Sequence, residues 1–319
     1  MDLLTNYGIF LAKTVTILVA VLIIISALFS QNKKINDELE ADCLNESLQK
    51  QKQKLIKKFK WKHIKKGKKT DLVKAPKLFV VDFHGDMKAS QSQQLREEIT
   101  SIIQVAQDGD EVMIRLESPG GIVNGYGFAA AQLDRLRQHR IPLTACIDQV
   151  AASGGYLMAC IANKIIAAPF AIIGSIGVVA QLPNFNKLLK KHDIDYEQIT
   201  AGDYKRTLTL FGENTEAGRK KFKEDIEQIH ENFKQHVLTH RPQLDIEKVA
   251  TGEHWLARDA MELGLVDELK TSDDFLLDKL SQYQIIILKQ YKNLSLLEKL
   301  TKGSTSMIQS IKQYFKITV

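Results

Sequence analysis

The sequence predicts an α/β protein with a largely parallel sheet and an N-terminal transmembrane helix. From Pro76 onward, short strands rich in β-branched residues alternate with helical segments, which is typical of βαβ units. Ahead of them, residues 9–29 form an apolar run about as long as the hydrocarbon core of a membrane. The 319 residues, 44% hydrophobic and 26% charged, have an ordinary globular composition and suffice to bury a sizeable core.

The apolar run at 9–29 reads IFLAKTVTILVAVLIIISALF and carries no charge from Thr14 to Ser30. Lys13 lies near its start, where a long side chain reaches the membrane interface. A cleaved signal peptide is the alternative, but the residues before the run are not basic and no small-residue cleavage motif follows it. We therefore expect residues 1–30 to form a retained membrane anchor.

Residues 31–75 form a charged linker, and its stretch 50–69 reads KQKQKLIKKFKWKHIKKGKK, with eleven lysines and no acid. Removing these eleven charges changes the formal net charge from +6 to −5, so the basicity is local. A basic cluster attracts anionic lipid or nucleic acid. Its place after an anchor favours membrane lipid over nucleic acid, because no base-reading motif accompanies it. An amphipathic helix on the membrane and a solvated helical linker remain equal alternatives.

In the domain that follows, we expect strands over 77–83, 111–118, 141–148 and 163–169, and helices over 91–106, 122–139 and 153–162. The stretch 150–180 is apolar enough to suggest a second membrane span. Lys164, Pro169 and several glycines interrupt it, which favours buried helix and strand pieces instead. Near the C-terminus, 283–291 has the pattern of a strand and 294–315 that of a helix.

Two glycine-bearing turns occur where a predicted strand gives way to a helix: SPGG at 118–121 and ASGG at 152–155. Helix starts leave backbone N–H groups unpaired, and glycine lets the backbone approach a reacting carbonyl closely. Each turn alone is typical of an ordinary strand–helix connection. Their occurrence in consecutive βα units favours a pair of backbone donors for an oxyanion.

The second turn contains Ser153, a candidate nucleophile that needs a proton acceptor. Most of the eight histidines lie on charged helical stretches such as HENFKQHVLTH, where we expect solvated side chains. His84, at the end of the first strand, is the runner-up among them. The other choice is a lysine, and Lys205 follows a predicted strand and a glycine turn. Lysine has an ordinary pKa of about 10.4, so a lysine base must be buried to become neutral.

No cofactor and no metal is expected from the sequence. The three cysteines, Cys43, Cys146 and Cys160, follow no metal-site spacing, and their scatter argues against a disulfide framework. The glycine turns lack the lysine of a phosphate-binding loop and the spacing of a dinucleotide-binding fold.

Four segments carry a family resemblance: VAASGGYLMACIANKIIAAP at 150–169, GSIGVV at 174–179, GDYKR at 202–206 and EHWLARDAMELGLVDEL at 253–269. Together they resemble the signal peptide peptidase A family of serine proteases, peptidase family S49, and most closely its SohB-type membrane-anchored members. The resemblance covers roughly residues 77–269. It implies a ClpP/crotonase-type βαβ superhelix, in a protease domain that we place at 76–270.

The same resemblance implies roles for individual residues. Ser153 corresponds to the family nucleophile and Lys205 to its general base. Ser175, in the GSIG turn, would hydrogen-bond the lysine and orient it. The backbone N–H groups of Gly120 and Gly154 would form the oxyanion hole, although Gly121 is so close in sequence that the choice between the two neighbours stays open.

The function implied is that of a membrane-bound serine endopeptidase with a Ser-Lys dyad, acting on membrane-associated peptides or signal-peptide remnants. The family also implies a ring-shaped homo-oligomer, octameric by analogy, with Ser153 and Lys205 in the same chain. Residues 271–319 would be an extension that contacts a neighbouring copy or the membrane. Two other classes stay open: a crotonase-like acyl-CoA enzyme, which shares the fold without the dyad, and a non-enzymatic membrane scaffold.

Two arguments disagree about the side of the membrane on which the catalytic domain lies. The resemblance implies a single-pass protein of the bacterial inner membrane with a periplasmic catalytic domain. The eleven lysines that follow the anchor predict the cytoplasmic side instead, since lysine and arginine near a span favour that side.

Overall fold

The computed structural model describes residues 6–19, 38–50 and 75–291. The chain divides into two units, Met1–Glu40 with Gln290–Val319, and Ala41–Lys289. In the first unit, residues 6–19 are helical. Within the described ranges, no helix is both long and apolar enough to cross a membrane. The predicted span from residue 20 onward, the lysine-rich stretch from residue 51 onward and the predicted helix at 294–315 lie outside these ranges.

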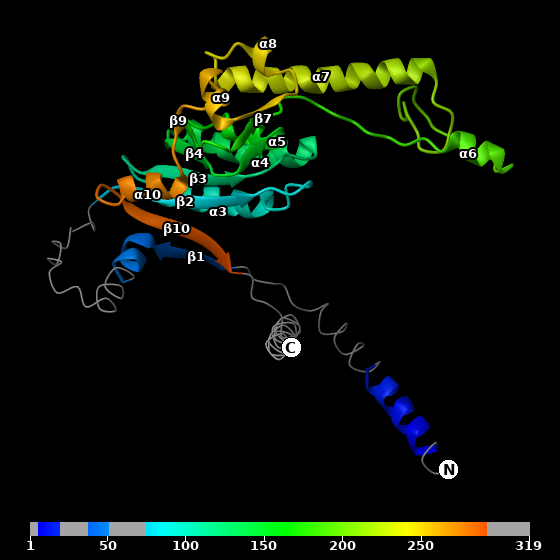
Figure 1. The fold of residues 1–319 in the computed structure, drawn as a ribbon, viewed down its shortest axis with the longest axis horizontal. Coiled ribbons are helices and arrows are strands. Elements are labelled where there is room, and N and C mark those ends of the chain that lie inside the picture. The colour runs from blue at the N-terminus through cyan, green and yellow to red at the C-terminus, as the bar shows by residue number, and fades with distance from the viewer. Residues whose placement is uncertain (1–5, 20–37, 51–74, 292–319) are drawn as a thin grey trace, which may run out of the picture. The chain divides into compact units, whose positions relative to one another are not determined.

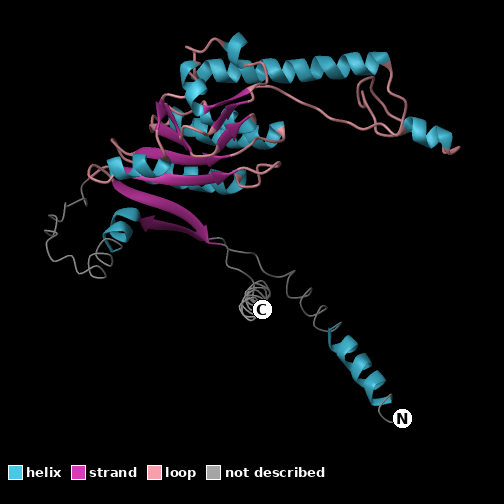
Figure 2. Cartoon of the chain, viewed as in Figure 1, coloured by secondary structure: helices cyan, strands magenta, loops and turns pink. Residues whose placement is uncertain are grey.

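A seven-stranded sheet has the order β1-β10-β2-β3-β4-β6-β9 (Figures 1 and 2), and its strands β2, β3, β4, β6 and β9 lie wholly in the second unit. The strands are β1 (Glu38–Cys43), β2 (Lys77–His84), β3 (Glu111–Glu117), β4 (Leu143–Ile147), β6 (Lys164–Ala167), β9 (Glu268–Leu269) and β10 (Gln284–Tyr291). From β10 to β9 every neighbouring pair is parallel. The prediction of an α/β protein with a largely parallel sheet is therefore confirmed.

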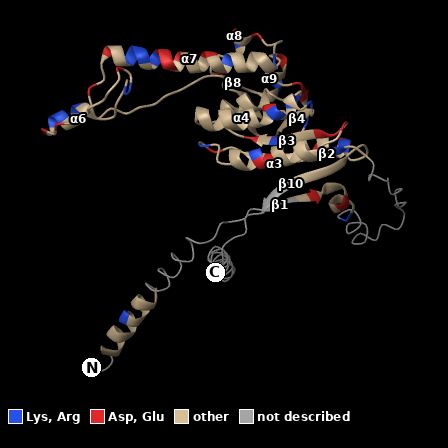
Figure 3. Cartoon of the chain, turned by 180° about the vertical axis from the view of Figure 1, so that it is seen from behind, with Lys and Arg blue, Asp and Glu red and all other residues tan. Residues whose placement is uncertain are grey.

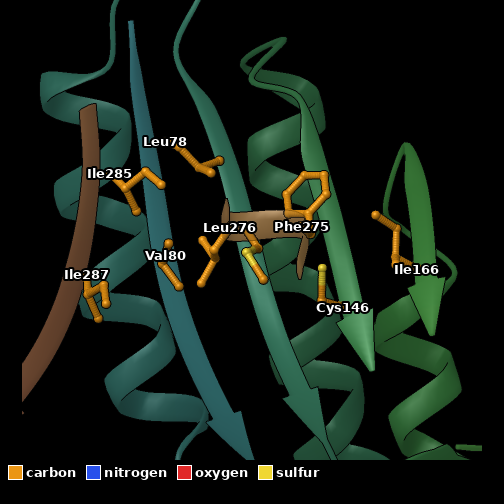
Figure 4. Packing of buried hydrophobic residues seen from close by; sticks show 9 residues of the cluster. Leu78, Val80, Cys146, Ile166, Phe275, Leu276, Ile285 and Ile287 are labelled. Carbon is orange, nitrogen blue, oxygen red and sulfur yellow. The ribbon is translucent and has the colours of Figure 1, made fainter. Parts of the chain in front are cut away.

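Helices cover both faces of this sheet. Tyr126 of α4 (Val123–Gln138) meets Phe83 of β2 edge to face, with ring centroids 6.4 Å apart, and α3 (Ser92–Val105) packs beside α4. On the opposite face, α10 (Ser272–Lys279) contributes Phe275 and Leu276 to a core cluster with Leu78 and neighbouring strands (Figure 4). Because both faces are covered, the strands are almost continuously apolar, as the sequence shows.

The C-terminal part of the body extends beyond the predicted domain end at residue 270. Strand β10 pairs with β2 in parallel, from Gln284↔Lys77 to Ile287↔Val80, and α10 lies across the same sheet. Burying a large apolar side chain stabilises a fold by about 1.5–3 kcal/mol, so Phe275 and Leu276 anchor this segment firmly. Residues 271–289 thus belong to the main unit rather than to a separate extension.

A second, three-stranded sheet positions the candidate site. It consists of β5 (Val150–Ala152), β7 (Ile172–Gly174) and β8 (His254–Leu256), in the order β5-β7-β8. Strands β5 and β7 run parallel, whereas β8 is antiparallel to β7. The short helices α5 (Gly154–Ala159) and α9 (Ala257–Glu262) follow β5 and β8 directly.

Residues 180–228, here called the arm, project from this body (Figure 1). The arm contains α6 (Asn186–Lys191) and the first half of α7 (Glu216–His240), which precedes α8 (Ile246–Val249). The buried residues of α7, Phe233 and Val237, both lie beyond the arm. Figure 3 shows lysines, arginines and acids interspersed along α7. Large apolar side chains of the arm are nevertheless exposed: Leu182, Phe185, Leu188, Ile194, Tyr196, Ile199, Tyr204, Leu210 and Phe211.

Candidate active site

Ser153 occupies a sharp, strained turn between β5 and α5. Its backbone has φ of 53° and ψ of −118°, a region that residues other than glycine rarely adopt. The Ser153 N–H donates to the Gly174 carbonyl at 2.8 Å, which holds the turn in place. Strained residues cluster at functional sites, and such a strand-to-helix turn exposes the nucleophilic serine of α/β-hydrolases.

Ser175 lies beside Ser153 because of the register of the second sheet. Ala152 of β5 pairs with Gly174 of β7 in parallel, so the residue that follows each strand leaves the sheet at the same edge. Ser175 also has φ of 53°, and its N–H donates to the Glu253 carbonyl at 2.6 Å. Both serines line one cavity. The structure thus brings together the predicted nucleophile and the predicted orienting serine.

Among the residues that the structure describes, the SPGG turn leaves the N–H of Gly121 unbonded rather than that of Gly120. The Gly120 N–H donates to the Ser118 hydroxyl at 3.1 Å, and the Ile122 N–H donates to the Met87 carbonyl at 2.9 Å. Between them, the N–H of Gly121 has no acceptor among the residues that the structure describes, and Gly121 lines the cavity. The geometry therefore favours Gly121 over Gly120 as an oxyanion donor.

Gly154 supplies the second unbonded N–H. As the first residue of α5 it has no intrahelical acceptor, and none of the described residues accepts from it. It lines the cavity with Ser153 and Gly121. Gly120 brings the two turns together: its φ is 91°, and a Cβ there would lie 2.7 Å from the Cβ of Ser153 and 2.8 Å from the Gly154 nitrogen. Only a residue without a side chain permits this approach.

The cavity has a volume of about 850 Å³ and runs between α4 and α7. Each helix contributes one face, from Val123 to Asp134 on α4 and from Ile229 to His240 on α7. Its lining is mostly apolar and includes Ala130, Ala131, Leu157 and Phe233. Such a cavity, apolar with a few polar groups, is typical of a ligand-binding site.

Two histidines of α7 line this cavity although the sequence predicts solvated side chains there. Nε2 of His236 lies 3.0 Å from the Leu157 carbonyl. The His240 side chain is largely buried near Asp134, with Nε2 3.9 Å from Oδ1. Burial lowers the pKa of both histidines. The prediction is wrong for these two residues, because they share a helix face with Phe233 and Val237. Each histidine follows one of those apolar positions by three residues, and that spacing was the available signal.

Lys205 lies on the exposed arm, away from Ser153. No strand precedes it within the described part of the arm, contrary to expectation, although its N–H does donate to the Gly202 carbonyl in a turn. Lys205 is not among the residues that line the cavity. Burial of Lys205 in an apolar pocket is therefore not found within one chain.

The separation follows from α7. Thr207 packs against Gly218 near the start of this helix, where a Cβ would lie 2.3 Å from the Thr207 carbonyl oxygen. The first α7 residue at the cavity is Ile229. Eleven helical residues between them correspond to roughly 16 Å. Ser153 and Lys205 of the same chain therefore do not meet in this conformation.

His84, the runner-up base, lies at a different place. It ends β2, its side chain is 65% exposed, and its Nδ1 is 3.5 Å from Oε2 of Glu117. It lines a smaller hollow with Asp82 and Arg115, apart from the cavity of Ser153. In this structure, His84 is therefore not placed to act as the base for Ser153.

These features define an α/β protein in which a strained serine and two unbonded backbone donors line one cavity. Residues 135–285 match peptidase family S49, and residues 2–133 match the N-terminal part of that family. The chain is 47% identical over 340 residues to the probable protease SohB of Haemophilus influenzae, covering 98% of this chain and 96% of that protein.

Two further relatives have the same description. The probable protease SohB of Buchnera aphidicola subsp. Acyrthosiphon pisum is 47% identical over 326 residues, covering 96% of this chain and 95% of that protein. Its counterpart from subsp. Schizaphis graminum is 48% identical over 333 residues, covering 98% and 96%. The chain therefore belongs to peptidase family S49, a family of proteases, as a SohB-type member. The resemblance read from the sequence is confirmed.

Proposed function

We propose that this protein is a membrane-bound serine endopeptidase of ClpP/crotonase-type fold with a Ser153–Lys205 dyad. The observation that carries the proposal is the strained Ser153, which shares a cavity with two unbonded backbone N–H groups. In the proposed reaction, the Ser153 hydroxyl attacks the peptide carbonyl carbon while the Lys205 amine takes its proton. The N–H groups of Gly121 and Gly154 stabilise the oxyanion. The proton passes to the departing amine, and water then hydrolyses the acyl-enzyme ester.

The amine of Lys205 accepts a proton only in its neutral form, which burial favours. Because Lys205 and Ser153 lie apart in one chain, we propose that the dyad forms between two copies, with the arm of one copy reaching the cavity of the next. The exposed apolar side chains of the arm support this arrangement, since burying them against a neighbour is favourable. Ser175, beside Ser153, would then receive and orient the amine.

The proposed substrates are apolar, membrane-associated peptides, including remnants of signal peptides. The support is the apolar lining of the cavity, where Leu157 and Phe233 would contact the side chains of a bound peptide. Residues 9–29 would hold the enzyme in the bacterial inner membrane, with the catalytic domain in the periplasm. Alkaline phosphatase fused to the C-terminus should then be active, whereas an inactive fusion would indicate the cytoplasmic side.

The central test is covalent labelling of the full-length protein by a peptide phosphonate, which reacts with an activated serine. We expect one label on Ser153 and loss of both labelling and peptide hydrolysis in Ser153→Ala. The matched control is Ser101→Ala, which removes a hydroxyl from the surface of α3 and should label normally. Unchanged hydrolysis by Ser153→Ala would overturn the proposal and favour a crotonase-like enzyme or a scaffold.

A further inference from the structure

A chain of hydrogen bonds lies directly behind the turn that carries the Gly121 donor. The Gly120 N–H donates to the Ser118 hydroxyl at 3.1 Å, and the Ser118 and Tyr126 hydroxyls are 2.5 Å apart. The Tyr126 hydroxyl in turn donates to the Asp86 carbonyl at 2.9 Å. These hydrogen bonds connect the SPGG turn, through the side chains of Ser118 and Tyr126, to the loop that follows β2.

The direction of every bond in this chain can be assigned by counting protons. The Asp86 carbonyl only accepts, so it takes the single hydroxyl proton of Tyr126. Ser118 must then donate its own proton to the Tyr126 oxygen, which leaves a Ser118 lone pair for the Gly120 N–H. Burial raises the pKa of Tyr126, so its hydroxyl keeps the proton on which the chain depends. Every donor in this series of hydrogen bonds therefore has one acceptor.

Both hydroxyl residues are fully buried, with 0% exposure for Ser118 and Tyr126. No water competes at such a position, so a missing hydroxyl leaves its partners unsatisfied. The ring of Tyr126 also lies against the other donor, because a Cβ on Gly154 would be 2.4 Å from its Cγ. One side chain thus contacts both turns: its ring supports Gly154, and its hydroxyl holds Ser118.

The loop after β2 fixes the other end of the same turn. The Ile122 N–H donates to the Met87 carbonyl, one residue beyond Asp86. The N–H groups on either side of Gly121 are therefore bonded, one through Ser118 and one directly. Among the N–H groups of this turn, that leaves Gly121 as the unbonded donor at the cavity, in a turn that is held at both ends.

We propose that Tyr126 and Ser118 are positioning residues, which hold the Gly121 and Gly154 N–H groups in the geometry that stabilises the oxyanion. This proposal rests on the proposed protease function, because it concerns the same site. Neither side chain needs to touch the substrate. Their role is to prevent rotation of the Gly120–Gly121 peptide, which would turn the donor away from the reacting carbonyl.

The first test is Tyr126→Phe, which keeps the ring against Gly154 and removes only the hydroxyl. Deleting an oxyanion donor typically costs about 10²–10³ in kcat, and a misplaced donor should cost less, about 10- to 100-fold. We expect KM to change less than about twofold, since the donors act on the transition state. Affinity for a peptide aldehyde, whose adduct with Ser153 places an oxygen in the same hole, should fall in parallel with kcat.

A second variant makes the test independent of any change at the tyrosine. Ser118→Ala removes the middle of the chain and should lower kcat to a similar extent. If the two hydroxyls act as one unit, Ser118→Ala combined with Tyr126→Phe should be no slower than the worse single variant. Multiplicative losses would contradict a shared role.

The matched control is Tyr156→Phe on α5. Tyr156 is also fully buried, and its hydroxyl donates to the Leu265 carbonyl at 3.1 Å, away from both turns. Its loss should lower the melting temperature about as much as Tyr126→Phe while leaving kcat and aldehyde affinity unchanged. A wild-type kcat in Tyr126→Phe, alongside an inactive Ser153→Ala, would overturn this inference alone. Activity in Ser153→Ala would overturn the proposed function instead.

Discussion

At the scale of single residues, the candidate site depends on how closely two backbone turns approach each other. Gly120 lies too near Ser153 and Gly154 to carry a side chain, and the Tyr126 ring excludes a side chain on Gly154. The strained φ of Ser153 is held by its bond to Gly174, in a turn that lines the cavity. Small residues are therefore required here by packing as well as by chemistry.

We expect Gly120→Ala to lower kcat by about 10² or more, because the new methyl group would displace Ser153 or the Gly154 donor. Gly109→Ala is the matched control: both glycines have φ of 91°, but a Cβ at Gly109 would find its nearest neighbour at 3.8 Å. The backbone strain is thus equal and only the crowding differs. Steady-state kinetics and the rate of phosphonate labelling measure the effect, and equal activity of the two variants would contradict it.

At the scale of elements, we expect the docking of α7 on the body to depend on pH. Burial lowers the pKa of His236 below its ordinary value of 6.5, and burial together with the neighbouring His236 lowers that of His240, against the opposing influence of Asp134. The unfolded chain then binds more protons than the folded chain in the range below pH 6.5. Stability therefore decreases as pH falls through this range.

The variant His236→Gln tests this dependence, because an amide can still donate to the Leu157 carbonyl but does not titrate. We expect wild type to lose more free energy of unfolding between pH 7.5 and pH 5.5 than His236→Gln, measured by urea denaturation. His139→Gln, on the exposed C-cap of α4, should keep the wild-type difference. Identical pH profiles for wild type and His236→Gln would refute the prediction.

The pH dependence of wild type must be compared with that of a variant, because Glu98 on α3 has an opposing effect. Glu98 makes the folded protein more stable as the pH falls, whereas the two histidines make it less stable. Burial raises the pKa of Glu98 to about 7. Its protonated form contributes stability that is fully present below the unfolded value of 4.5 and is lost as pH rises through about 7. Wild type and His236→Gln share this contribution, so it cancels in their difference.

At the scale of the whole molecule, packing within one chain does not explain why the arm exposes so many apolar side chains. The arm carries large exposed apolar side chains on either side of the predicted base, with Ile199 at 95% and Tyr204 at 67% before it and Phe211 at 40% after it. Exposed apolar groups gathered in this way mark an interaction surface. A ring of identical chains would cover each arm and bring Lys205 of one copy to Ser153 of another.

Co-expression of Ser153→Ala with Lys205→Ala tests this arrangement. Each variant alone should be inactive. If each site takes its serine and its lysine from different copies, random assembly should restore about a quarter of the wild-type activity. A dyad within one chain predicts no recovery, and that outcome would refute the two-copy arrangement. Lys220→Ala, which removes an exposed lysine of α7, should be active by itself.

The sequence by itself determined the alternation of strands and helices, the two glycine turns and the family. Strand and helix patterns are local, so the strand predicted at 77–83 matches β2 and the helix predicted at 91–106 matches α3 closely. Ser153 could be singled out because the residues that make its turn are contiguous. The segments that resemble family S49 likewise depend only on short runs of residues.

Tertiary structure decided the features that depend on contacts between distant segments. The choice of Gly121 over Gly120 follows from a hydroxyl that is held by Tyr126 and Asp86. The burial of His236 depends on Leu157, 79 positions away in the chain. The separation of Ser153 from Lys205 depends on the length and direction of α7, which no local pattern specifies. Hydrogen bonds and packing between segments far apart in sequence are set only when the whole chain is folded.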